Sequence, residues 1–222
     1  MSAPYLSLLL ADGRLPTGAH TQSGGVEPAF QAGMGLAQVP DYLLVRLRTV
    51  TEVEAATAVL ARQVWSDDGA DRLGRLRRLD AAWRARTASD ALRDAADLLG
   101  RSYLRLAGGV WDLSLLTGAG RVWCRAVVVG ATAAAAGLSA AETARLVAFD
   151  DVQTVFAAAL KLIPFDPAHG VAWAVRAQPE VERLVARVAG LTHLDDLPAP
   201  TAPLLEQWGQ QHRSSERRLF RA

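Results

Sequence analysis

Apolar residues recur every three or four positions along most of this chain. In the clearest run the steps are four, three, four and three, which places on one helical face Leu92, Ala96, Leu99, Tyr103 and Leu106. No segment of useful length alternates apolar and polar residues as a half-buried strand would. The pattern predicts an all-α fold, and 222 residues with 50% hydrophobic content suffice for a single-domain helical bundle with a large core.

Breaking residues divide this pattern into expected helices. The segment 40–65 reads as one amphipathic helix, which ends at Asp67-Asp68-Gly69. A shorter helix is expected over 73–83, before a polar turn at 87–90. Residues 123–137 are apolar on nearly every side, so this helix is expected at the centre of the domain.

Capping signals mark the later helices. Ser139 and Glu142 have capping-box spacing, in which each side chain can bond the other's backbone amide. The helix that they open is expected to end at Pro164. Asp166-Pro167 and Gln178-Pro179 each predict the start of a further helix, because proline suits the first helical turn.

The segment from Leu10 to Glu27 differs from the helical remainder in its density of turn formers. Pro16 fixes one backbone angle, while Gly18 and the pair Gly24-Gly25 permit conformations that a β-carbon would forbid. We therefore expect a rigid loop that presents a shaped surface before a helix starting near Glu27.

The last 25 residues also differ in composition. Three prolines between 198 and 203 predict a semi-rigid linker, which places a boundary between a helical core, 1–197, and a linker with a C-terminal tail, 198–222. The tail is arginine-rich and contains Leu219 and Phe220. Two interpretations are open: a frayed, solvated end, or a segment that orders on a partner, with apolar anchors and with Arg217 or Arg218 binding carboxylates.

Composition argues against several functional classes. The 24 basic and 23 acidic residues give a net charge of +1, which offers no reason to expect nucleic acid or an anionic membrane as partner. The longest apolar stretch, 126–138, is shorter than the roughly 20 residues of a membrane span. Cys124 is the only cysteine, so no internal disulfide can form and a cytoplasmic location is expected.

Motifs for catalysis, nucleotide or metal are equally weak. The chain has no Gly-Lys-Ser/Thr sequence for a phosphate loop, and its four histidines lack the three- to five-residue spacing of a metal pair. Asp150 and Asp151 are adjacent, so on a helix they point about 100° apart and cannot form a carboxylate dyad. We expect no cofactor, no bound metal and no enzymatic activity.

Three blocks of the sequence resemble the UreF family of urease accessory proteins. The first is the pattern of Asp12, Leu15, Pro16, Gly18, Gly25 and Glu27 in the N-terminal loop. The second comprises Arg86-Thr-Ala-Ser89 and the helix from Gln153 to Lys161-Leu-Ile-Pro164. The third is Pro203-Leu-Leu-Glu206 with His212 and Arg218-Leu-Phe220. The chain departs from the family at His20-Thr-Gln-Ser23, where Phe-Ser-His-Ser is frequent, and at Trp123-Cys-Arg125, where a histidine is frequent.

The resemblance implies a dimeric, non-catalytic helical chaperone for nickel insertion into apo-urease. Such a protein would bridge the accessory protein UreD, also called UreH, and the GTPase UreG, and would influence GTP hydrolysis. We expect one contact surface at Pro16, Gly18 and Glu27, and another formed by Glu206, His212, Arg217, Arg218 and Phe220. Lys161, the sole lysine, is the expected cation facing the GTPase, although a helix C-terminus would also favour a lysine there.

Two alternatives belong to other functional classes. The first is a helical enzyme or small-ligand-binding regulator with a pocket near His20 and Ser23. The second is a helix bundle on a membrane surface, for which the near-neutral charge gives little support.

Overall fold

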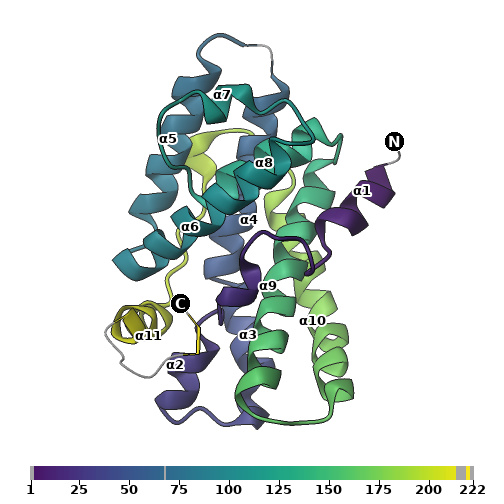
Figure 1. The fold of residues 1–222 in the computed structure, drawn as a ribbon, viewed down its shortest axis with the longest axis vertical. Helices are drawn as coiled ribbons and strands as arrows, with labels where there is room; N and C mark the ends of the chain where they lie inside the picture. The colour runs from purple at the N-terminus through teal and green to yellow at the C-terminus, as the bar shows by residue number, and fades with distance from the viewer. Residues whose placement is uncertain (1–2, 68, 214–218, 221–222) are drawn as a thin grey trace.

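A computed structural model of the chain describes residues 3–67, 69–213 and 219–220, and all regular structure in these ranges is helical. The all-α prediction is therefore confirmed. Helix α4 (Val50–Ser66) lies at the centre and contacts five others (Figure 1). These are α3 (Val39–Leu47), α5 (Arg72–Ala85), α8 (Arg125–Ala135), α9 (Ala140–Leu162) and α10 (Pro167–Val188).

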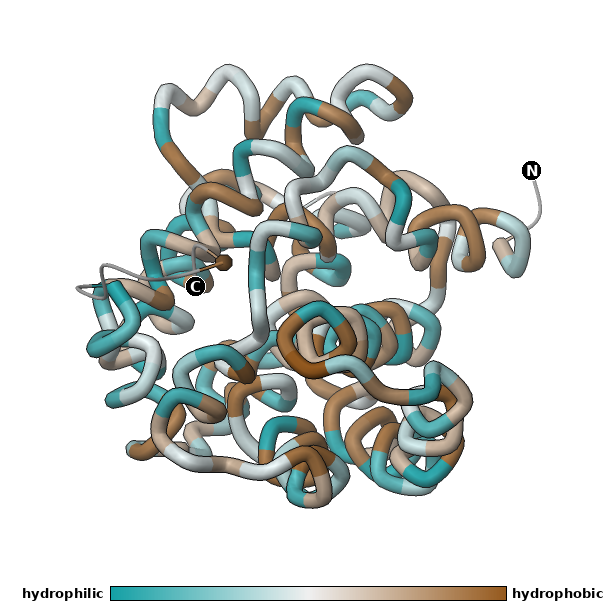
Figure 2. Tube along the Cα trace, turned by 60° about the horizontal axis from the view of Figure 1, so that its bottom comes forward, coloured by the Kyte–Doolittle hydropathy of each residue, from teal (hydrophilic) through white to brown (hydrophobic). Residues whose placement is uncertain are grey.

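Shorter elements complete the fold around this centre. Helix α6 (Asp90–Ala107) packs on α8, and α11 (Pro203–Arg213) packs on α6 and on α2 (Val26–Gln31). Helix α1 (Ala3–Leu10) extends away from the body, and its residues are largely hydrophobic (Figures 1 and 2). The other short elements are α7 (Ser114–Thr117) and the 3-10 turns η1 (Ala19–Thr21), η2 (Leu36–Gln38) and η3 (Leu194–Asp196).

The α4–α8 crossing explains why a helix rich in alanine and glycine occupies the core. A β-carbon on Gly130 of α8 would lie 2.2 Å from the carbonyl oxygen of Ala58 and 2.6 Å from the β-carbon of Ala61. The two backbones therefore approach at a distance that only glycine permits. All residues of α8 from Ala126 to Ala133 are buried, which confirms the expected central position of this helix.

Helix ends follow the predicted capping signals closely. Ser139 and Glu142 form the capping box at the start of α9, with the Glu142 amide 3.2 Å from Ser139 Oγ and the Ser139 amide 2.7 Å from Glu142 Oε2. Helix α9 stops two residues before Pro164. Asp166 caps α10 by accepting the Ala168 amide at 2.9 Å, and Pro167 occupies the first helical turn, as expected.

Two boundary predictions are wrong. The segment 40–65 forms two helices, because the backbone leaves helical geometry at Thr49 (φ −132°, ψ −97°), where the run Thr-Val-Thr has low helix propensity. Gln178-Pro179 starts no helix, since Pro179 lies inside α10. Helix α10 packs on α9 on both sides of the proline, with Gly170 against Phe156 before it and Glu182 paired with Arg145 after it, and this packing outweighs the loss of one backbone hydrogen bond.

The linker and the described residues of the tail lie against the helical core. Arg86 donates to the carbonyl oxygens of Leu197 and Pro198, each at 3.0 Å, which fixes the start of the linker. The division at residue 197 stays a prediction. In the described ranges, no helix is both long enough and apolar enough to cross a membrane.

Candidate partner-binding site

The N-terminal loop adopts backbone conformations that favour glycine. Gly18, Gly24 and Gly25 have φ angles of 84°, 59° and 79°. A β-carbon at Gly25 would also lie 2.6 Å from the hydroxyl of Tyr42. Glycine is therefore required at position 25 for two reasons, a left-handed backbone and a close approach.

Helix α3 anchors this loop through one carbonyl group. Tyr42 donates its hydroxyl to the Gly24 carbonyl oxygen at 2.6 Å, and Arg46 donates a guanidinium N–H to the same oxygen at 2.8 Å. Arg46 also forms two hydrogen bonds with the Asp151 carboxylate of α9, at 3.0 and 2.5 Å, and Thr51 donates to Asp151 at 2.7 Å. The loop is thus fixed to α3 and α9 by a nearly buried ion pair.

Burial of Asp151 and its pairing with Arg46 act on the pKa of this carboxylate in opposite directions. Burial acts to raise the pKa of Asp151, but the Arg46 charge and the hydrogen bonds from Arg46 and Thr51 hold that pKa below its usual value. Burial raises the pKa of Tyr42 to about 12, so its hydroxyl stays protonated and can donate to Gly24. Both groups therefore keep their hydrogen-bonding roles at neutral pH.

The C-terminal tail is joined to the loop through a buried carboxylate. Glu27 accepts the backbone N–H groups of Leu219 at 2.6 Å and Phe220 at 2.9 Å. His212 Nε2 lies 3.3 Å from Glu27 Oε2 and 3.2 Å from the carbonyl oxygen of Phe220. Glu27, His212 and Phe220 are all at most 5% exposed. We call Glu27, His212, Leu219 and Phe220 the tail junction.

Helix α11 positions the tail junction by binding the start of α6. The Ser89 amide donates to Glu206 at 2.9 Å, and the Ser89 hydroxyl donates to Gln210 at 3.1 Å. Trp208 stacks against Tyr42 with ring centroids 6.5 Å apart. Helix α11 therefore connects the Arg-x-Ala-Ser segment to the helix that anchors the N-terminal loop.

A surface groove of about 350 Å³ lies between the N-terminal loop and α9 and reaches the tail junction. Its wall includes Asp12, His20, Gln153, Lys161 and Phe220. The Lys161 ammonium lies 3.4 Å from the His20 carbonyl oxygen and 5.3 Å from the centre of the Phe220 ring. An exposed cation thus lies over a buried aromatic ring, where loop, α9 and tail meet.

The structure divides the predicted site residues into exposed and buried groups. Pro16 and Lys161 are exposed, and Gly18 and Glu206 are partly exposed. Glu27, His212 and Phe220, expected on two separate contact surfaces, instead meet in one intramolecular junction. Arg217 and Arg218 lie outside the described residues. Whether any of these residues binds a partner stays a prediction.

His20 and Ser23 lie in different surroundings, although the small-ligand alternative expects both at one pocket. Ser23 is fully buried, and its hydroxyl accepts the Gly25 amide at 3.2 Å, so Ser23 belongs to the loop's internal structure. His20 is exposed at the edge of the surface groove. The two side chains therefore do not share the mouth of a pocket.

Sequence reasoning missed Tyr42 and Arg46, which hold the loop. The available signal was one arginine in the last turn of a largely apolar helix, but its partner Asp151 is 105 positions away. Such a pairing leaves no local pattern. Within the described part of the chain, no group of three or more histidine, cysteine, aspartate or glutamate side chains is arranged to hold a metal ion.

The fold and the site define an all-helical protein in which an N-terminal loop and a C-terminal tail meet in one junction. The family model UreF matches residues 35–178. The chain is 36% identical over 222 residues to the urease accessory protein UreF of Mycolicibacterium vanbaalenii, and 34% identical to those of Mycobacterium marinum over 224 residues and Mycobacterium tuberculosis over 225 residues. Each alignment covers 99% of both chains. The chain belongs to the UreF family of urease accessory proteins.

Proposed function

We propose that this protein is a non-catalytic adaptor in the insertion of nickel into apo-urease. In this role it acts as a homodimer in the cytoplasm, binds UreD (UreH), recruits the GTPase UreG and modulates GTP hydrolysis. Family membership supports a role in urease maturation, because the relatives are named urease accessory proteins. The finer assignments are the proposal.

The tail junction is the observation that carries this proposal. Glu27 binds two backbone amides of a tail that lies more than 190 positions away in sequence. Phe220 forms part of the groove wall, so the surface groove has the shape described above only while the tail is docked. A partner that binds the tail can therefore change the surface offered to a second partner, as an adaptor requires.

The two predicted partner surfaces then take different roles. Glu27, His212 and Phe220 are buried, so we assign them to holding the tail in place. Pro16 and Lys161 are exposed around the groove and are assigned to direct contact, with Lys161 facing UreG. Arg217 and Arg218, next to the junction in sequence, are assigned to carboxylates of a partner.

Co-expression with the UreD and UreG proteins of the same source tests the adaptor role. Complexes of the intact chain would be isolated by pull-down and sized by chromatography with light scattering. We expect a stable assembly that is lost when residues 204–222 are removed. An intact chain that forms no complex with either protein would contradict the proposal.

A point variant tests the contribution of the groove to partner binding without removing the tail. Lys161→Ala removes the groove's cation and its contact with the Phe220 ring but leaves the hydrogen bonds between Glu27 and the tail in place, so UreG recruitment should fall while UreD binding is unchanged. Arg176→Ala, at an exposed position of α10, is the matched control. Equal UreG recruitment by both variants would remove Lys161 from the proposed interface.

A further inference from the structure

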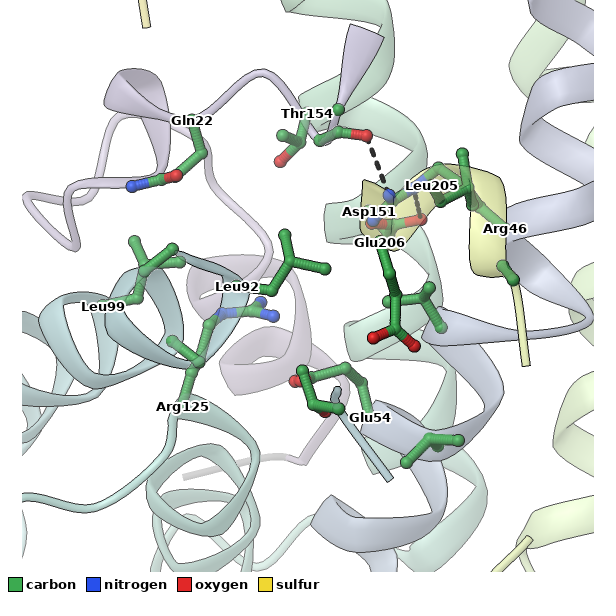
Figure 3. A pocket seen from close by; sticks show the side chains of 18 of the residues that line it. Gln22, Arg46, Glu54, Leu92, Leu99, Arg125, Asp151, Thr154, Leu205 and Glu206 are labelled. Atoms are coloured by element: carbon green, nitrogen blue, oxygen red, sulfur yellow. Dashed lines mark hydrogen bonds and ion pairs between the residues drawn. The ribbon is translucent and has the colours of Figure 1, made fainter. Parts of the chain in front are cut away.

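A partly open cavity of about 150 Å³ lies between α4, α6, α9 and α11, apart from the tail junction (Figure 3). Apolar side chains from α4, α6 and α11 form part of its wall: Val50, Val53, Leu92, Ala95, Leu99 and Leu205. An apolar cavity of this volume can hold a body the size of a benzene ring. The cavity is therefore large enough for a small organic molecule.

The positive charges of the wall are already paired. Arg46 binds Asp151, and Arg125 binds Asp150 at 2.6 Å. Arg86 donates to carbonyl oxygens, as described above. None of these guanidinium groups is therefore available as the main site for an anion, because each would have to give up an existing partner.

Two carboxylates of the wall are paired only with neutral donors. Glu54 accepts the indole N–H of Trp83 at 2.7 Å, and Glu206 accepts the Ser89 amide at 2.9 Å. Among the described residues, neither carboxylate forms an ion pair with an arginine, lysine or histidine. The wall thus has four carboxylates against three guanidinium groups, a net excess of one negative charge, and Glu54 and Glu206 are its two carboxylates outside the ion pairs of Asp150 and Asp151.

We propose that this cavity binds a small organic cation, with a ring-sized apolar body among the α6 leucines and one ammonium or amidinium group directed at Glu54. The indole of Trp83 lines the same cavity and adds an aromatic surface that favours a cation. Burial removes water from the Glu54 carboxylate, and the neutral indole N–H of Trp83 compensates for only part of that loss. A charge-assisted hydrogen bond from a bound cation would compensate for more of it. This inference goes beyond the adaptor role and does not depend on it.

The position of Glu206 links the cavity to the tail. Glu206 and Leu205 belong to α11, which also contains His212 of the tail junction. A bound cation would therefore contact the helix that holds the tail, and binding should stabilise the docked form of α11.

Binding of three molecules of equal ring size tests the charge preference. Calorimetric titration or ligand-observed NMR of the full chain would compare benzylammonium, neutral toluene and benzoate. We expect benzylammonium to bind at least tenfold more tightly than either of the others. Binding of toluene or benzoate as tight as that of benzylammonium, or no binding of benzylammonium, would overturn the proposal.

Variants then place the binding in the cavity. Glu54→Gln should weaken benzylammonium binding roughly tenfold or more, because a charged acceptor is replaced by a neutral one. Ala95→Leu fills part of the cavity and should abolish benzylammonium binding. Glu206→Gln tests whether the second carboxylate contributes to that binding. Glu182→Gln, on the surface of α10, is the control and should bind as the parent does. Unchanged binding by both Glu54→Gln and Ala95→Leu would place the ligand elsewhere and overturn the proposal.

Discussion

Phe220 and Glu27 lie 193 positions apart in sequence, yet the Phe220 amide donates to the Glu27 carboxylate at 2.9 Å inside a buried junction. The Leu219 amide binds the other oxygen of the same carboxylate at 2.6 Å. One acidic side chain on a short helix thus satisfies two backbone donors of the tail. The position of the tail depends on this carboxylate.

The first prediction concerns this contact. Glu27→Gln leaves one acceptor oxygen for two amides and should weaken tail docking by about 1.5–3 kcal/mol, the usual cost of losing a hydrogen bond to a charged group. Hydrogen exchange at the Leu219 and Phe220 amides should accelerate about tenfold or more, as measured by NMR. Glu182→Gln is the control, and exchange rates equal to those of the parent would show that Glu27 does not hold the tail.

The second prediction concerns the glycine pair of the loop. Gly25→Ala adds a β-carbon at a position with φ 79° and only 2.6 Å from the Tyr42 hydroxyl. Gly120→Ala is the matched control, because Gly120 has φ 63° but no neighbouring atom within 4 Å of the added carbon. Left-handed backbone alone costs about 1–2 kcal/mol, so Gly25→Ala should lower the free energy of unfolding clearly more than Gly120→Ala does. Urea denaturation measures the free energy of unfolding of both variants. Equal losses would show that the close approach to the Tyr42 hydroxyl adds no cost at position 25.

Local features of this fold could be predicted from the sequence, whereas the junctions between distant segments could not. The capping box of Ser139 and the stop before Pro164 depend on neighbouring residues, and both have the predicted roles. The continuous helix through Pro179 depends on packing against α9, which no local pattern contains. Sequence patterns identified Glu27 and Phe220 separately, but their contact follows from the path of the whole chain.

The third prediction concerns the ion pair that anchors the loop. Asp151→Asn leaves Arg46 charged and nearly buried without its carboxylate, which should cost about 3 kcal/mol or more at pH 7. The pKa of Asp151 is below its ordinary value of 3.8 in the folded state, so its stabilising contribution is complete above that pH. The contribution is lost as the pH falls through the lower, folded-state pKa. Denaturation between pH 3 and 7 measures the free energy of unfolding of the parent and of Asp151→Asn. The difference between the two proteins should narrow only at the acidic end of this range.

The fourth prediction concerns Glu54, where removal of the carboxylate charge should raise the free energy of unfolding, whereas at Asp151 it should lower it. Burial raises the pKa of Glu54 above its ordinary 4.5, so the folded state favours the protonated carboxyl and its ionisation at pH 7 is destabilising. Glu54→Gln keeps an oxygen that can accept the Trp83 indole N–H but removes the charge. The variant should therefore be more stable than the parent at pH 7, by an amount on the order of 1 kcal/mol.

This gain should disappear on acidification, because below about pH 4 the parent's carboxyl is protonated in both the folded and the unfolded state. Urea denaturation of the two proteins across this range measures the difference, and Glu182→Gln controls for the loss of any carboxylate. A gain in stability together with weaker benzylammonium binding would indicate that Glu54 retains a charge at a stability cost because the cavity requires it for a cationic ligand. A Glu54→Gln protein that is less stable than the parent at pH 7 would instead indicate that the ionised carboxylate supports the fold.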